Sequence, residues 1–161
     1  MTTEKKLKLT AEPGKQELFI VREFEAPRDM VFKAYTDPDL LIKWLGPNGY
    51  TMAIDYYEPK NGGAYRYIHT DPKGNEYCFH GVIHTMQAPE MLIQTFEFEG
   101  MPTKGHVSLD TAIFEELPNG RTKLTIQSVY KSVADRDGMI SSGMEYGLTE
   151  GFAKLDEILA S

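Results

Sequence analysis

The stretch that decides the fold lies near the C-terminus and reads, from Ser141 to Leu159, SSGMEYGLTEGFAKLDEIL. At about 100° per residue, its large apolar side chains fall in one arc about 120° wide, which predicts a helix that packs one face on a core. Polar residues such as Asp156 take the solvent side of the helical wheel. The residues on the apolar arc are Ile140, Met144, Leu148, Gly151, Phe152, Leu155, Ile158 and Leu159.

Three glycines recur within this helix at a spacing of four residues, Gly143, Gly147 and Gly151. Each glycine in a helix interior costs roughly 0.8–1.0 kcal/mol relative to alanine, so another contribution must offset the cost. One hypothesis is that the glycines allow close packing between the helix and the sheet. The other is that Gly147 and Gly151 help to open a ligand cavity between them.

Length, charge and cysteine content limit the classes of protein that this chain can belong to. A chain of 161 residues fits one domain, which we place at 16–160, after a segment over 1–15 that we expect to be disordered. The formal net charge of −7 argues against nucleic acid or an anionic membrane as the main partner. Cys78 is the only cysteine, which excludes an internal disulfide and favours a cytoplasmic location.

Turn and cap residues divide the remaining sequence into short elements. Gln16–Glu25 alternates as a strand does, and Pro27 and Pro38, the latter capped by Asp37, each begin a short helix. Hairpin signals such as Asn119-Gly120 separate the later strands. These strands are predicted at Tyr50–Glu58, Ala64–Thr70, Glu76–Met86, Met91–Phe98, His106–Leu117 and Arg121–Tyr130. The order predicts an α+β fold in which a strongly bent antiparallel sheet of about seven strands wraps around the C-terminal helix.

Three groups of motifs resemble one superfamily. Arg22–Leu45, which contains Trp44 and is followed by Gly46-Pro47, resembles the START-like, or polyketide-cyclase-like (SRPBCC), helix-grip superfamily. The glycine-bounded hairpin over 61–81 is similar to its central hairpin. Ser142–Gly147 and Lys154–Leu159 resemble the end motif of one branch, the family related to the activator of the ninety-kilodalton heat-shock protein's ATPase.

The resemblance, which covers 16–160, implies a helix-grip fold that holds a small hydrophobic molecule, lipid-like or aromatic, between sheet and C-terminal helix. The protein would then be a carrier or a sensor. A cyclase-like or hydrolase-like enzyme in the same cavity is the first alternative, and a chaperone-regulating interaction protein is the second. The co-chaperones of that branch carry a further domain that these 161 residues lack, so we expect the binding role in preference. With the resemblance counted, we favour the cavity hypothesis for Gly151.

Each predicted strand offers two faces, and one of them must point toward the helix. We choose the more aromatic faces, because Tyr65 then lies across from Gly81 and can cover the bare glycine. The inward residues predicted in this way are Tyr65, Tyr67 and His69; Tyr77, Phe79, Gly81 and Ile83; Leu92, Gln94, Phe96 and Phe98; Val107, Leu109, Thr111 and Ile113; and Leu124, Ile126, Ser128 and Tyr130. Such a wall suits a small-molecule pocket and equally an ordinary core.

The predicted ligand-binding residues come from this wall and from the C-terminal helix. Trp44 is either a core anchor or a residue at the cavity mouth. If the protein is an enzyme, His69 is the candidate general acid or base, because histidine titrates near neutral pH, and Tyr67 and Gln94 would hold a substrate oxygen. The full set is Trp44, Tyr65, Tyr67, His69, Phe79, Gln94, Phe96, Met144, Gly147, Leu148, Gly151 and Phe152.

The sequence predicts neither a metal site nor a cofactor. His80 and His84 lie on one predicted strand about 13 Å apart, which is too far to share a metal ion. The glycine-rich turns match no nucleotide-binding pattern.

Overall fold

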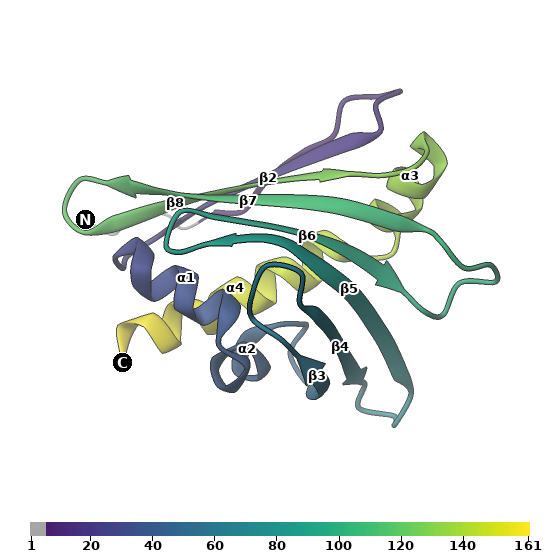
Figure 1. The fold of residues 1–161 in the computed structure, drawn as a ribbon, viewed down its shortest axis with the longest axis horizontal. Coiled ribbons are helices and arrows are strands. Elements are labelled where there is room, and N and C mark those ends of the chain that lie inside the picture. Colours follow the sequence, from purple (N-terminus) through teal and green to yellow (C-terminus); the bar gives the residue numbers. More distant parts are fainter. Residues whose placement is uncertain (1–5) are drawn as a thin grey trace.

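One eight-stranded antiparallel sheet forms most of the molecule (Figure 1). The structure, a computed structural model, describes residues 6–161. The strands lie in the order β1-β2-β8-β7-β6-β5-β4-β3. Their bounds are β1 Lys8–Thr10, β2 Glu17–Phe24, β3 Thr51–Tyr57, β4 Ala64–Thr70, β5 Glu76–Gln87, β6 Met91–Phe98, β7 Val107–Leu117 and β8 Arg121–Val129. The helices are α1 Arg28–Thr36, α2 Pro38–Trp44, α3 Val133–Ser141 and α4 Met144–Ala160.

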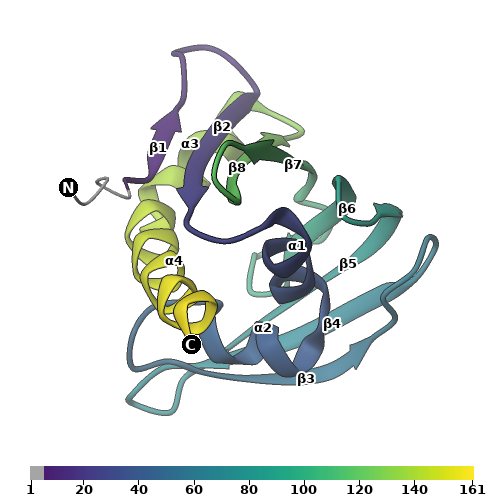
Figure 2. The ribbon, with the colours of Figure 1, turned by 90° about the vertical axis from the view of Figure 1, so that its left-hand side faces the viewer.

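The sheet is curved, and the helices α1, α2 and α4 lie on its concave side. Figure 2 shows the curve running from β1 at the top, through β5 at the right, to β3 at the bottom. The element order that predicted this arrangement is confirmed, including the two short helices, the second of which begins at Pro38 with Asp37 as its cap. The helix-grip architecture expected from the sequence is therefore present.

The sheet has one strand more than the seven predicted. This strand, β1, lies inside the N-terminal segment that was expected to be disordered. β1 pairs with β2 so that Leu9 lies opposite Ile20, and Leu7 and Leu9 pack against the core. Alternation of lysine and leucine over residues 6–9 is the signal for this edge strand, and its shortness made it easy to miss. The expectation also covered residues 1–5, which lie outside the described residues.

The C-terminal helix expected over Ser141–Leu159 is present as α4, and a further helix, α3, comes directly before it. Gly143 adopts a φ of 93°, a left-handed conformation that glycine tolerates best, and α4 begins directly after it. The preceding helix, α3, was missed because its sequence has little apolar periodicity. Its N-terminus is capped by Ser132, whose hydroxyl oxygen accepts a hydrogen bond from the Asp135 N–H at 3.0 Å.

The core is closed around the middle of α4. Phe152 and Leu155 are fully buried, and the Phe152 ring meets Phe24 edge-on at 5.4 Å and stacks on Trp44 at 5.9 Å. The indole N–H of Trp44 donates to the Ala34 carbonyl at 3.0 Å. Trp44 is therefore a core anchor that joins α1, α2 and α4, and it does not stand at a cavity mouth.

Asp156 was expected on the solvent side of the helix, and the structure contradicts this. Its carboxylate receives two hydrogen bonds from Arg22 of β2, at 2.6 and 3.2 Å. Arg22 is only 4% exposed and also lies over the Phe24 ring, 4.9 Å from its centroid. A buried ion pair thus fixes the second half of α4 to the sheet.

Four of the five predicted inward faces are confirmed, and the face of β7 is wrong. Gln94 of β6 faces inward, and its partner on β7 is Asp110, so Asp110 must share that side of the sheet. Leu109, predicted to point inward, is 46% exposed, whereas Ser108 is buried. The inward residues of β7 are therefore Ser108, Asp110, Ala112 and Phe114, in place of Val107, Leu109, Thr111 and Ile113. The more apolar set does not face inward, because pairing with the neighbouring strands fixes which residues of β7 lie on the concave side.

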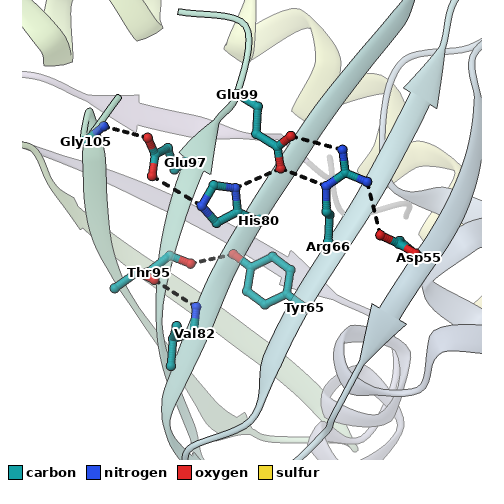
Figure 3. Close-up of polar contacts among 9 residues, drawn as sticks. All are labelled: Asp55, Tyr65, Arg66, His80, Val82, Thr95, Glu97, Glu99 and Gly105. Carbon is teal, nitrogen blue, oxygen red and sulfur yellow. Dashed lines mark hydrogen bonds and ion pairs between the residues drawn. The ribbon is translucent and has the colours of Figure 1, made fainter. Parts of the chain in front are cut away.

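Tyr65 covers Gly81 as expected, and its hydroxyl also forms a hydrogen bond with the backbone of β6 (Figure 3). The Tyr65 hydroxyl donates to the Thr95 carbonyl, and the Val82 N–H donates to Thr95 Oγ1 at 2.8 Å. Side chains thus replace backbone hydrogen bonds between β5 and β6 at this point. A β-carbon on Gly81 would lie 2.0 Å from the Thr95 carbonyl oxygen, so only glycine fits here.

Candidate functional site

The concave face is closed at one end and partly open at the other. Met144 and Leu148 lie on the same apolar face of α4 as the fully buried Phe152 and Leu155, yet they are only half-buried. On the sheet, the inward rings also keep part of their surface accessible to solvent; these are Phe79, Phe96 and Phe98. The first half of α4 and the middle of the sheet therefore present apolar surface that the protein does not cover.

Stacked aromatic rings form the part of this face that lies on β4, β5 and β6. The Tyr67 ring stacks on Phe79 at a centroid distance of 5.3 Å, and Phe79 stacks in turn on Phe96 at 5.3 Å. The Phe98 ring lies 5.2 Å from that of Phe79. We call these four residues the aromatic wall.

A carboxylate that sequence reasoning missed, Asp110, lies beside the aromatic wall. The Ser108 hydroxyl donates to its Oδ1 at 3.1 Å, and Ser128 lies directly opposite on β8. Burial raises the pKa of Asp110 to about 6, and hydrogen bonds from Ser128 and Ser108 limit the increase. Asp110 nevertheless keeps some accessible surface, which indicates that it faces the partly open region.

The negative charge of this carboxylate also acts on the hydroxyl groups of two buried tyrosines. Burial raises the pKa of Tyr67 and Tyr130 well above the usual range, and the negative charge of Asp110 raises both further. Sequence reasoning missed this cluster because it chose the opposite face of β7 as the inward one. The signal for the correct face was the alternating set Ser108, Asp110 and Ala112, which lies on the same side of the sheet as Gln94 of the neighbouring strand.

His69 is buried against the loop that follows α2. Its ring occupies the space where a β-carbon on Gly46 would lie, and its centroid lies 5.2 Å from that of the Tyr67 ring in an edge-to-face arrangement. Burial and, to a smaller extent, the charge of Lys154 lower the pKa of His69 to about 4. His69 is thus neutral at neutral pH, which removes the reason for assigning it general acid or base chemistry.

The two glycines predicted to border a cavity face the chain around the end of α2. A β-carbon on Gly151 would lie 3.0 Å from the Trp44 carbonyl oxygen and 3.5 Å from backbone atoms of Gly46. A β-carbon on Gly147 would lie 3.6 Å from the Pro47 ring. Close packing explains Gly151, and the cavity hypothesis for it is wrong.

The structure thus divides the twelve predicted site residues into two groups. Those that line the partly open concave face are Tyr67, Phe79, Gln94, Phe96, Met144 and Leu148. Those engaged in packing or internal hydrogen bonds are Trp44, Tyr65, His69, Gly147, Gly151 and Phe152.

A second polar cluster lies on the opposite, convex face of the sheet (Figure 3). Arg66 holds Glu99 through two hydrogen bonds, at 2.9 and 3.0 Å, and reaches Asp55 at 3.1 Å. His80 lies between Glu99 at 2.8 Å and Glu97 at 3.3 Å. These contacts join β3, β4, β5 and β6, and within residues 6–161 no group of three such side chains is arranged to hold a metal ion. The cluster therefore braces the sheet.

Two surface hollows of about 340 Å³ each lie near the start of α1, around Arg28. Carboxylates such as Glu90 and Glu116 lie on their rims, and none of the twelve predicted site residues lines either hollow. They are open and of mixed charge, whereas the concave face combines an apolar wall with convergent polar groups. The latter combination is typical of small-molecule sites, so we place the candidate site on the concave face.

A curved antiparallel sheet that grips a C-terminal helix defines a START-like (SRPBCC) helix-grip domain, the fold class of known ligand-binding domains. The family described as "Activator of Hsp90 ATPase homolog 1-like protein" matches residues 25–160. Since this match covers most of the sequence, the chain belongs to that family.

Solved structures of bacterial proteins resemble this chain over nearly its full length. A crystal structure from Rhodobacter sphaeroides is 27% identical with a TM-score of 0.84, covering 94% of this chain and 97% of that one. A solution structure from Arthrobacter aurescens is 28% identical with a TM-score of 0.85, covering 95% and 91%. Protein Ms6760 from Mycobacterium smegmatis shares the fold at 24% identity, with a TM-score of 0.86 and coverage of 96% and 97%. No curated protein matches the sequence.

None of the helices described over residues 6–161 is long and apolar enough to cross a membrane.

Proposed function

We propose that this protein binds a small hydrophobic molecule, lipid-like or aromatic, between the aromatic wall and the first half of α4, as a carrier or sensor. The observation that carries the proposal is the uneven burial of α4, with Phe152 and Leu155 fully buried but Met144 and Leu148 half-buried. Apolar surface left in contact with water costs about 25 cal/mol per Å², so a ligand that covered it would gain this free energy. The free thiol of Cys78 supports a cytoplasmic setting for this role.

An enzyme in the same region is the second candidate, and Asp110 is the observation that favours it. A carboxyl group with a pKa of about 6 is suited to proton transfer near neutral pH. This assignment replaces the earlier one on His69. Loss of any detected turnover in Asp110→Asn, with the fold intact, would support it. The chaperone-regulating alternative is supported by the family match over residues 25–160, and no contact described within residues 6–161 adds to that support.

Binding can be measured with N-phenyl-1-naphthylamine, an uncharged probe whose fluorescence rises in apolar surroundings. We expect saturable binding of one probe molecule per wild-type chain. Leu148→Trp should weaken binding at least tenfold, because the larger side chain fills the space beside α4. Ile42→Trp adds the same side chain at an exposed position on α2 and should leave binding unchanged. Absence of saturable binding to the wild type, or equal loss in both variants, would contradict the proposal.

A further inference from the structure

We propose that the bound molecule carries a protonated amine on its apolar or aromatic body, and that this amine pairs with the Asp110 carboxylate. The inference rests on the proposed function and adds the charge and orientation of the ligand. It follows from the groups around Asp110, from the other charges near the concave face, and from the position of the aromatic wall.

The groups around Asp110 include no cation of the protein. Within residues 6–161, its hydrogen-bond partners are the hydroxyls of Ser108 and Ser128, and it forms no ion pair. Its neighbours across the strands are Gln94 on β6 and Ser128 on β8. Tyr67 and Tyr130, whose pKa values its charge raises, are neutral. Because a buried carboxylate is normally paired with a positive charge, the missing partner points to the ligand.

Positive groups elsewhere near the concave face are already engaged or uncharged. Arg22 binds Asp156 at the closed end of the core. Lys154 lies beside the loop after α2, where its ammonium donates to the Pro47 carbonyl at 3.5 Å. His69 is neutral because burial lowers its pKa to about 4. Asp110 therefore gives the partly open region a negative charge that no ion pair within residues 6–161 neutralises.

The aromatic wall adds a second attraction for a cation. Phe96 lies opposite Ser108 and is thus a diagonal neighbour of Asp110, about 7–8 Å away between Cα atoms. Ring faces attract ammonium groups within about 6 Å, and the effect is larger where water is excluded. Figure 3 shows that the Tyr65 hydroxyl points to Thr95, so it is not free for a ligand. Tyr67 is largely buried, and its hydroxyl makes no hydrogen bond within the described residues.

The ionisation of Asp110 is compatible with this pairing. Burial raises the pKa of its carboxyl to about 6, so most molecules carry the charge at pH 7.5. A bound ammonium would stabilise the carboxylate and lower this pKa. Affinity for an amine should therefore fall when the pH is reduced from 7.5 to 5, as Asp110 becomes protonated.

Three probes of one shape separate charge from hydrophobicity: 4-phenylbutylamine, 4-phenylbutan-1-ol and 4-phenylbutanoate. By titration calorimetry at pH 7.5, we expect the amine to bind the wild type at least tenfold more tightly than the alcohol, and the carboxylate to bind most weakly. Asp110→Asn should remove the preference for the amine and leave the affinity for the alcohol within about twofold. Asp55→Asn removes the same charge from the convex face, and it should preserve the preference.

The outcomes distinguish this inference from the proposed function. Equal affinity for amine and alcohol, together with normal binding of N-phenyl-1-naphthylamine, would overturn the inference alone. So would equal loss of amine binding in Asp110→Asn and Asp55→Asn, because that result would reflect net charge only. Failure of the wild type to bind the uncharged naphthylamine would instead overturn the proposed function.

Discussion

Gly147 and Gly151 are one helical turn apart, and the structure predicts that replacing each by alanine shifts the melting temperature in opposite directions. Gly151→Ala places a methyl group 3.0 Å from the Trp44 carbonyl oxygen, a backbone atom that cannot rotate away. Overpacking of about 1–3 kcal/mol should exceed the helix-propensity gain of about 1 kcal/mol, so the melting temperature should fall. Gly147→Ala meets only the Pro47 ring, at 3.6 Å, and should raise the melting temperature. Thermal unfolding followed by circular dichroism checks both, and shifts of the same sign would contradict this packing.

Asp110 should make the free energy of unfolding depend on pH in a defined direction. Its pKa rises from 3.8 in the unfolded chain to about 6 in the folded protein, so the folded state binds more protons between these values. Its contribution to stability is therefore present below pH 3.8 and is lost as the pH rises through 6, by up to about 3 kcal/mol. His69 acts in the opposite sense, because its pKa falls from 6.5 to about 4 on folding.

Comparison of Asp110→Asn with the wild type isolates the carboxyl from the histidine. Urea unfolding of ligand-free protein should show the variant to be more stable at pH 7.5, with the advantage shrinking toward pH 4. An advantage that stayed constant over this range would show that Asp110 has an ordinary pKa.

For single residues, sequence reasoning was more reliable in choosing important side chains than in assigning them to a face of a strand. Tyr65 opposite Gly81 was predictable because the bare glycine needs an aromatic cover. Asp110 was not, because the choice of face on β7 weighed hydrophobicity, whereas pairing with Gln94 decides it. The carboxylate that organises the candidate site was therefore hidden by an error of one residue in parity.

Among the elements, α4 is fixed to the sheet by buried apolar residues and by one charged residue. Leu155→Ala should reduce the free energy of unfolding by about 2–5 kcal/mol, as expected for a fully buried leucine. Asp156→Ala should cost about 3–5 kcal/mol, because it leaves the guanidinium of Arg22 buried without its partner. Glu157→Ala, at an exposed neighbouring position, should change stability by less than about 0.5 kcal/mol. If Asp156→Ala behaved like Glu157→Ala in urea unfolding, the ion pair would not form in solution.

The junction of β5 and β6 depends on a side-chain hydroxyl. Tyr65→Phe keeps the ring over Gly81 but leaves the Thr95 carbonyl without its donor. We expect a loss of about 1–3 kcal/mol and faster amide exchange at Val82 and its neighbours. Tyr56→Phe on the exposed side of β3 is the matched control, and it should have little effect. Similar stability of the two variants would argue against the Tyr65 hydrogen bond.

Element boundaries show where the sequence pattern is sufficient and where it fails. Strong periodicity and proline-started helices predicted α2 and α4 and the later strands. The short strand β1 and the helix α3 carry few apolar residues, and both are held by tertiary contacts, such as the bonds from Arg136 to the carbonyls of Glu12 and Glu17. Contacts between residues more than a hundred positions apart leave no local signal.

For the whole molecule, the bent sheet around a C-terminal helix was predictable from element order. The division of the concave face into a closed and an open part was not. That division depends on where Trp44 and Phe152 meet and on how far the aromatic wall extends, which only the packed structure shows. The proposed ligand site is a consequence of this unequal closure.

The most direct test of the central claim is a nuclear magnetic resonance titration of the labelled protein with 4-phenylbutylamine. We predict that the largest chemical-shift changes occur on the concave face, at Phe79, Gln94, Asp110 and Leu148, and that they saturate at one ligand per chain. Residues on the convex face, such as Val82 and Leu109, should be unaffected. Shifts confined to the convex face or to the hollows around Arg28, or no saturable shifts at all, would contradict a site for an amine-bearing ligand between sheet and helix.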